Sequence, residues 1–161
     1  MLGILAVLAL LIFLVVHFAF PEEKPFFKCA LVNQKIDSDR DVVLSEEFAT
    51  FSGLDAKRIV FDSDYVISYK EAEEKQDAVI LTKDFLKYCT SVGGEYYSAD
   101  EFEIKDLNLC EAGGTKAIDL TGTKLESELD GTEKEDLVLV FTATGIHKEM
   151  CQKYIDFLSE K

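Results

Sequence analysis

His147 is the residue of this sequence best suited to acid–base chemistry, because it is the only histidine outside the apolar first 20 residues. An imidazole titrates near neutral pH and can serve as a general base for a serine or cysteine nucleophile. Cys151 follows four positions later, so a helix would carry both side chains on one face, where they could also ligate a metal. No nucleophile-elbow motif accompanies the pair, and two ligands are too few for a metal site. His147 is therefore a candidate catalytic base without an identified reaction.

Thr144 and Gly145 stand between an apolar segment and a helix-like segment. Backbone N–H groups at such a junction can hold an anion. A single glycine, with Lys148 as the only lysine nearby, falls short of a P-loop or a dinucleotide motif and favours helix capping. Thr144 and Gly145 are thus further functional candidates, and the sequence indicates no cofactor.

All four cysteines, Cys29, Cys89, Cys110 and Cys151, lie outside the apolar run. An even number in a small domain behind a hydrophobic amino terminus is typical of disulfides. Cys89 and Cys110 each precede a Gly-Gly pair, so we expect these two to pair, with Cys29 joined to Cys151. Buried free thiols are the main alternative, and metal ligation is a weaker one because no Cys-x-x-Cys motif is present.

Residues 37–41 place aspartates at alternate positions, as at the start of a calcium-binding loop. Such a loop needs a glycine at its sixth position and a bidentate acid at its twelfth. Val42 and Phe48 occupy these positions here. The segment is therefore expected to be a solvated loop and not a metal site.

The elements that would position these residues alternate between strand and helix patterns. Short apolar segments predict strands at 27–32, 78–81 and 137–141, and a weaker one at 118–120. Residues 58–61 and 65–69 are expected to form a hairpin around a turn at 62–64. Helices are expected at 83–92, capped by Thr82, and at 146–159, with a short helix or loop at 125–129. We therefore predict an α+β domain with a mixed sheet and a C-terminal strand–helix unit, and a three-layer α/β fold is the alternative.

The charge balance excludes one class of partner. The chain has 31 acidic and 17 basic residues and a net charge of −14. A polyanion would be repelled by this charge, so nucleic acid is not an expected partner.

Residues 2–20 contain no Asp, Glu, Lys or Arg. As a helix these 19 residues would extend about 28 Å, close to the roughly 30 Å hydrocarbon core of a bilayer. A cleaved secretory signal would have a basic start, a shorter apolar stretch and small residues before the cut. We therefore expect a transmembrane signal-anchor helix at 1–20, a short stalk at 21–27 and one acidic domain at 28–161.

The expected protein is a single-pass membrane protein whose domain serves binding or assembly, with the lipid bilayer and an unidentified protein as partners. The predicted disulfides favour an extracytoplasmic domain, although Lys24, Lys28 and Lys35 favour the opposite orientation under the positive-inside rule. Two alternatives stay open. One is a membrane-tethered enzyme using His147 or a cysteine, and the other is a secreted, disulfide-stabilised domain released by signal cleavage.

Overall fold

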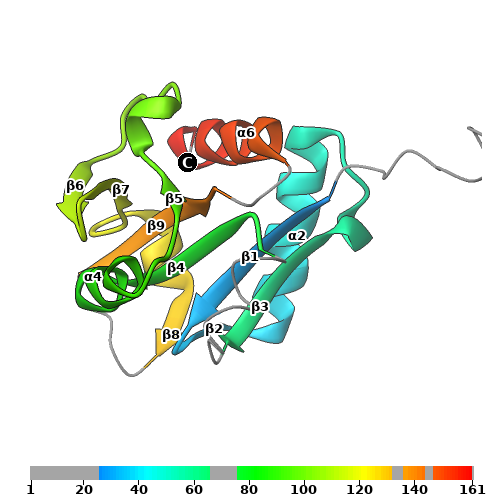
Figure 1. Ribbon diagram of the computed structural model, residues 1–161. Helices are drawn as coiled ribbons and strands as arrows, with labels where there is room; N and C mark the ends of the chain where they lie inside the picture. Colours follow the sequence, from blue (N-terminus) through cyan, green and yellow to red (C-terminus); the bar gives the residue numbers. More distant parts are fainter. Residues whose placement is uncertain (1–25, 66–75, 132–135, 144–146, 161) are drawn as a thin grey trace, which may run out of the picture.

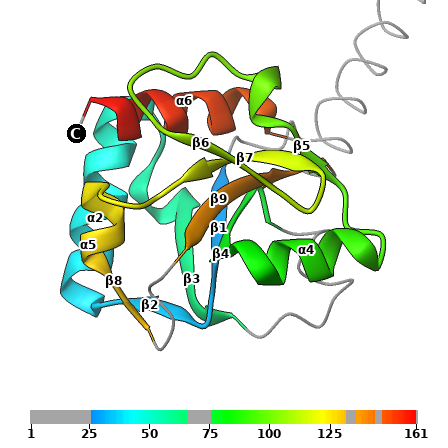
Figure 2. The ribbon, with the colours of Figure 1, turned by 90° about the vertical axis from the view of Figure 1, so that its left-hand side faces the viewer.

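The computed structural model describes residues 26–65, 76–131, 136–143 and 147–160. A mixed β-sheet runs through the centre of these residues, with helices on both of its faces (Figures 1 and 2). The α+β prediction with a mixed sheet is therefore confirmed. In chain order the elements are β1 (Phe27–Val32), β2 (Gln34–Ile36), α2 (Ser38–Ser52), η1 (Ala56–Arg58), β3 (Ile59–Tyr65), β4 (Ala78–Thr82), α4 (Lys83–Ser91), β5 (Tyr96–Tyr97), η2 (Ala99–Glu101), β6 (Leu109–Ala112), β7 (Thr115–Asp119), α5 (Lys124–Glu128), β8 (Leu129–Gly131), β9 (Leu137–Thr142) and α6 (Lys148–Ser159).

The strands of the main sheet are ordered β3-β1-β4-β9-β7-β6, and β5 pairs with the end of β9. The first three strands are parallel, whereas β9, β7 and β6 join antiparallel. β1, β4 and β9 are the central strands, and their near-continuous apolar sequences match a sheet buried on both faces. β2 and β8 form a separate two-stranded sheet.

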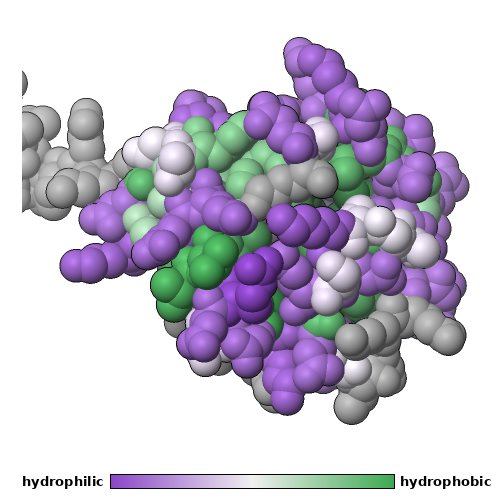
Figure 3. Space-filling view, turned by 180° about the vertical axis from the view of Figure 1, so that it is seen from behind, coloured by the Kyte–Doolittle hydropathy of each residue, from purple (hydrophilic) through white to green (hydrophobic). Residues whose placement is uncertain are grey.

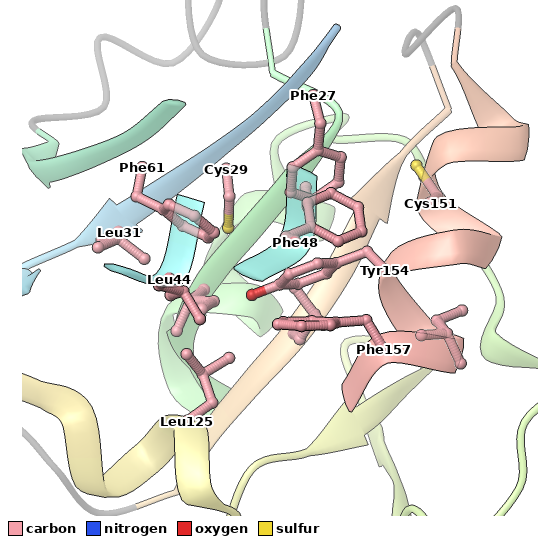
Figure 4. Packing of buried hydrophobic residues seen from close by; sticks show 14 of the residues in the cluster. Phe27, Cys29, Leu31, Leu44, Phe48, Phe61, Leu125, Cys151, Tyr154 and Phe157 are labelled. Atoms are coloured by element: carbon pink, nitrogen blue, oxygen red, sulfur yellow. The ribbon is translucent and has the colours of Figure 1, made fainter. Parts of the chain in front are cut away.

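Two groups of buried side chains lie on opposite faces of the sheet. The larger group is covered by α2, α5 and α6, and the smaller by α4. Phe27, Phe48 and Tyr154 form the centre of the larger group, with ring centroids 4.6–5.2 Å apart (Figure 4). These rings join β1, α2 and α6, so the first strand and the last helix are held against each other.

Helix α4 follows the sequence prediction closely. The Thr82 hydroxyl accepts a hydrogen bond from the Phe85 N–H and caps the helix, and Val92 ends it. Leu86 and Cys89 are buried on its inner face, whereas Val92 is 45% exposed. The last helix was predicted with similar success and begins at Lys148 in the structure.

Two local predictions were wrong. The expected turn at 62–64 lies inside β3, which continues to Tyr65 as a parallel partner of β1. Its polar side chains find partners there, since Ser63 accepts a hydrogen bond from the Ile36 N–H and Asp62 accepts one from Gln76. The expected loop at 37–41 is the start of α2.

Helix α2 begins where Asp37 accepts a hydrogen bond from the Asp39 N–H, and it ends at Gly53, whose φ of +78° is left-handed. The aspartates therefore cap a helix and complement its dipole instead of forming a loop. No group of three or more potential metal ligands occurs among the residues that the structure describes.

The described part of the chain contains no helix with the length and apolar character needed to span a bilayer. The predicted anchor at 2–20 lies outside the described residues. β1 begins at Phe27, the last residue of the predicted stalk.

Candidate functional site

His147 lies directly before α6, and its ring faces the start of β4. Its Nδ1 atom is 3.0 Å from Oδ1 of Asp77, a residue 70 positions earlier in the chain. The Asp77 side chain is 2% exposed and that of His147 is 11% exposed. Folding therefore joins the one candidate base to a carboxylate that the sequence analysis did not identify.

The backbone around Asp77 holds its carboxylate in place. Its N–H donates to the Lys28 carbonyl and its carbonyl accepts from the Thr142 N–H, so the residue is bound between β1 and β9. The second carboxylate oxygen, Oδ2, accepts from the Lys28 N–H at 3.0 Å. Both oxygens of Asp77 are thus engaged, one by the backbone and one by the imidazole.

Burial is the main influence on the ionisation of Asp77, and it raises the pKa of this carboxyl above its ordinary value of 3.8. The hydrogen bonds from the Lys28 N–H and from His147 act in the opposite direction and favour the carboxylate. An ionised Asp77 accepts a hydrogen bond from a protonated Nδ1 of His147. When the imidazole is neutral, its other nitrogen, Nε2, then carries no proton. This is the relation between a general base and its orienting carboxylate.

The Phe26 ring covers the imidazole from the side of the amino terminus. The centroids of the Phe26 and His147 rings are 4.0 Å apart in an edge-on arrangement. Nζ of Lys28 lies 5.5 Å from the centroid of the Phe26 ring. The site therefore sits where the described chain begins, immediately after the segment that contains the apolar run.

Cys151 is close to this site but is not arranged as a nucleophile. Its Sγ donates to the Asp77 carbonyl at 3.7 Å. Burial raises the pKa of the Cys151 thiol well above its usual range, and the pKa of Cys29 is raised for the same reason. Both thiols are protonated at neutral pH, and a protonated thiol is a poor nucleophile.

All four cysteines are free thiols in the structure. The expected Cys89–Cys110 and Cys29–Cys151 disulfides are therefore not formed, and the alternative of free thiols describes the structure. Figure 4 shows the sulfur atoms of Cys29 and Cys151 apart, with aromatic side chains of the core between them. Cys29, Cys89 and Cys151 are at most 2% exposed and fill space between strands and helices, as small apolar side chains do.

A second polar contact continues the site toward β3. The Thr142 hydroxyl donates to the Gln76 carbonyl, and Nε2 of Gln76 donates to Asp62 at 3.1 Å. The other amide atom, Oε1 of Gln76, is buried without a hydrogen-bond partner in the described part of the chain. Thr144 and Gly145, the remaining candidates from the sequence, lie outside the described residues.

Sequence reasoning missed Asp77 and Phe26. The available signal for Asp77 was its position directly before a buried strand, where a charged side chain must find a partner. In a chain with 31 acidic residues this signal does not single out one aspartate.

Comparisons with protein families, with curated proteins and with solved structures give no match for this chain.

Proposed function

We propose that this chain is a single-pass membrane-anchored protein that presents a small acidic domain for binding or assembly. The observation that carries the proposal is the uncharged apolar run at 2–20. The domain starts at Phe26–Phe27, only a few residues after this run, so the domain would sit close to the membrane. Exposed apolar side chains on α2, among them Val42 and Phe51, support a binding role.

We further propose that the domain is extracytoplasmic. Lys24, Lys28 and Lys35 favour the opposite orientation under the positive-inside rule, but their number is small and Glu22 and Glu23 lie nearer the apolar run. Free thiols are compatible with either side of a membrane, so the cysteines no longer contribute to this choice. The orientation therefore needs a direct test.

Labelling of a new surface cysteine tests both anchoring and orientation. Tyr88 is 57% exposed on α4, so Tyr88→Cys provides a thiol that a membrane-impermeant maleimide can reach in the folded protein. The unaltered chain is the control, because three of its cysteines are buried and Cys110 is only partly exposed. We expect labelling of Tyr88→Cys in intact cells; labelling only after lysis would contradict the extracytoplasmic domain.

A membrane-tethered enzyme is the second candidate function, and the Asp77 carboxylate 3.0 Å from His147 Nδ1 favours it. A base of this type requires a neutral imidazole with the proton on Nδ1 and Nε2 free. Long-range ¹H–¹⁵N spectra of the full chain report which ring nitrogen carries the proton, and the enzyme hypothesis expects it on Nδ1. A proton on Nε2 would exclude His147 as the base, and Asp77→Asn would serve as the control that removes the orienting charge.

The secreted alternative differs from both in the residue at which the mature chain begins. It requires a mature chain that begins after the apolar run, whereas an anchored protein retains residues 2–20.

A further inference from the structure

We propose that the groove between the C-terminal ends of α2 and α6 binds a cationic amphipathic segment of a partner protein. This inference rests on the proposed binding function and names the chemical class of the partner. The groove is a hollow of about 430 Å³. Among the described residues, Glu47, Thr50, Phe51, Phe157 and Glu160 line it.

The floor of the groove is apolar and continuous with the core. Phe51 is 38% exposed, and its ring centroid lies 5.6 Å from that of Phe157. Phe157 in turn packs against Phe48, with centroids 5.3 Å apart, and Phe48 is fully buried. The floor is thus supported from beneath, and a partner would add an apolar side chain on top of a preformed aromatic surface.

Figure 3 views the molecule from the side of α2 and shows hydrophobic side chains gathered among hydrophilic ones on this face. An apolar floor with a polar rim is the usual form of a groove that accepts one face of an amphipathic helix. The hollow falls within the range of about 300–1,000 Å³ typical of ligand pockets. It can therefore receive an anchoring side chain of a partner segment.

The electrostatics of the groove favour a cation. Residues from the carboxyl ends of α2 and α6 line the groove, and the carboxyl end of a helix carries a partial negative charge. Neither α2 nor α6 has a basic residue in its last turn. Glu47 and Glu160 add carboxylates at the two sides of the floor.

One cation of the chain already reaches this end of α2, because Nζ of Lys153 donates to the Ser52 carbonyl at 3.1 Å. This contact shows that one carbonyl group at the end of α2, that of Ser52, accepts an ammonium group. Lys161, the last residue of the sequence, lies outside the described residues.

The same charges disfavour other occupants. A second copy of the chain would bring another net charge of −14 to an acidic rim, and an anionic lipid surface would also be repelled. A helical segment with lysine or arginine on one face and large apolar residues on the other is complementary to both the floor and the rim.

The probe for the test is a fluorescent 14-residue peptide of leucine and lysine whose leucines share one helix face. Its binding is measured by anisotropy with the full chain in phosphatidylcholine nanodiscs, and empty nanodiscs give the blank. We expect micromolar binding that weakens with salt. Phe51→Ser and Glu160→Lys should each weaken binding at least tenfold.

The matched control variants lie on α4, on the opposite face of the sheet. Tyr88→Ser and Asp84→Lys make the same kinds of change at exposed positions and should leave binding unaltered. Glu160→Lys alters a residue at the end of α6, outside the core, so it tests the groove even if Phe51→Ser fails to fold.

Equal binding of a peptide with the same composition in scrambled order would overturn the proposal, as would unchanged binding by Glu160→Lys. Membrane association is measured separately by sedimentation after alkaline washing. Failure of peptide binding with retained membrane association contradicts only the groove, whereas loss of membrane association contradicts the anchored protein.

Discussion

At the scale of single residues, the Asp77 carboxylate lies in a buried environment, where an ionised group is energetically unfavourable. Asp77 is almost fully buried, and the partners of its two oxygens are the Lys28 N–H and the His147 ring. A buried charge is tolerated only when its hydrogen bonds are satisfied. His147 is therefore expected to contribute to stability whatever its chemical role.

His147→Ala should destabilise the protein by about 2 kcal/mol at neutral pH, because it leaves the Asp77 carboxylate buried without its imidazole partner. Burial raises the pKa of Asp77. The folded protein therefore bears the free-energy cost of a buried carboxylate only when the pH rises through that pKa, and at lower pH the carboxyl is protonated and the cost is absent. The difference from the unaltered chain should therefore shrink as the pH falls toward the ordinary aspartate pKa of 3.8. Urea unfolding across this pH range measures it, and a difference that grows in acid would contradict this account.

Lys83 gives a second pH-dependent prediction. Its hydrogen bonds to Asp119 and Asp136 raise the pKa of Lys83 above 10.5. For Asp119, burial alone would raise the pKa, but the hydrogen bonds from Thr121 and Lys83 lower it below 3.8. Stability from the lysine is complete below pH 10.5 and is lost as the pH rises through its raised pKa. Stability from the aspartate is complete above pH 3.8 and is lost as the pH falls through its lowered pKa.

Lys83→Met should thus cost about 0.5–1 kcal/mol, roughly constant between these limits and smaller outside them. Thermal unfolding at several pH values measures this cost. Lys87→Met is the matched control, since the Lys87–Asp84 pair is exposed and spans one helical turn. An equal loss for both variants would show that the position of Lys83 at the start of α4 has no special importance.

Tyr154 carries a hydroxyl group inside the hydrophobic core. The side chain is fully buried, and Oη has no hydrogen-bond partner among the residues that the structure describes. Removing an unsatisfied polar group from a core is neutral or favourable. Tyr154→Phe should therefore leave stability unchanged or raise it by about 1 kcal/mol, as measured by chemical unfolding. A loss above 1 kcal/mol would reveal a hydrogen bond of this hydroxyl.

At the scale of elements, local chemistry decided which predictions succeeded. α4 was predictable because Thr82 is a good cap and its apolar residues share one face, and β9 was predictable because it is apolar throughout. α2 was missed because exposed apolar residues such as Val42 and Phe51 blur its apolar stripe, and because its aspartates resemble those of a loop. β3 was misread since Asp62 and Ser63 find partners that only the folded chain supplies.

The start of α2 can be tested by removing its cap. Asp37→Ala deprives the Asp39 N–H of its acceptor and should cost about 1 kcal/mol in unfolding experiments. Asp39→Ala is the control, because Asp39 lies in the first turn of α2 and is not its cap. Comparable losses in the two variants would argue against capping by Asp37.

At the scale of the whole molecule, the parallel and antiparallel parts of the sheet bring distant segments to one site. Asp77, Thr142 and His147 meet beside β1 because β4 lies between β1 and β9. The sequence identified His147 but not its partners, since sheet order is set by long-range packing and not by local pattern. The α+β class followed from the alternation of strand and helix patterns alone.

The proposed membrane protein retains residues 2–20 in its mature form, and these residues hold it in a membrane. Intact mass spectrometry of the protein recovered from carbonate-washed membranes tests this most directly. We expect the protein to stay in the membrane pellet with a mass that includes residues 2–20. A chain that starts after residue 20, or one found in the supernatant, would contradict it.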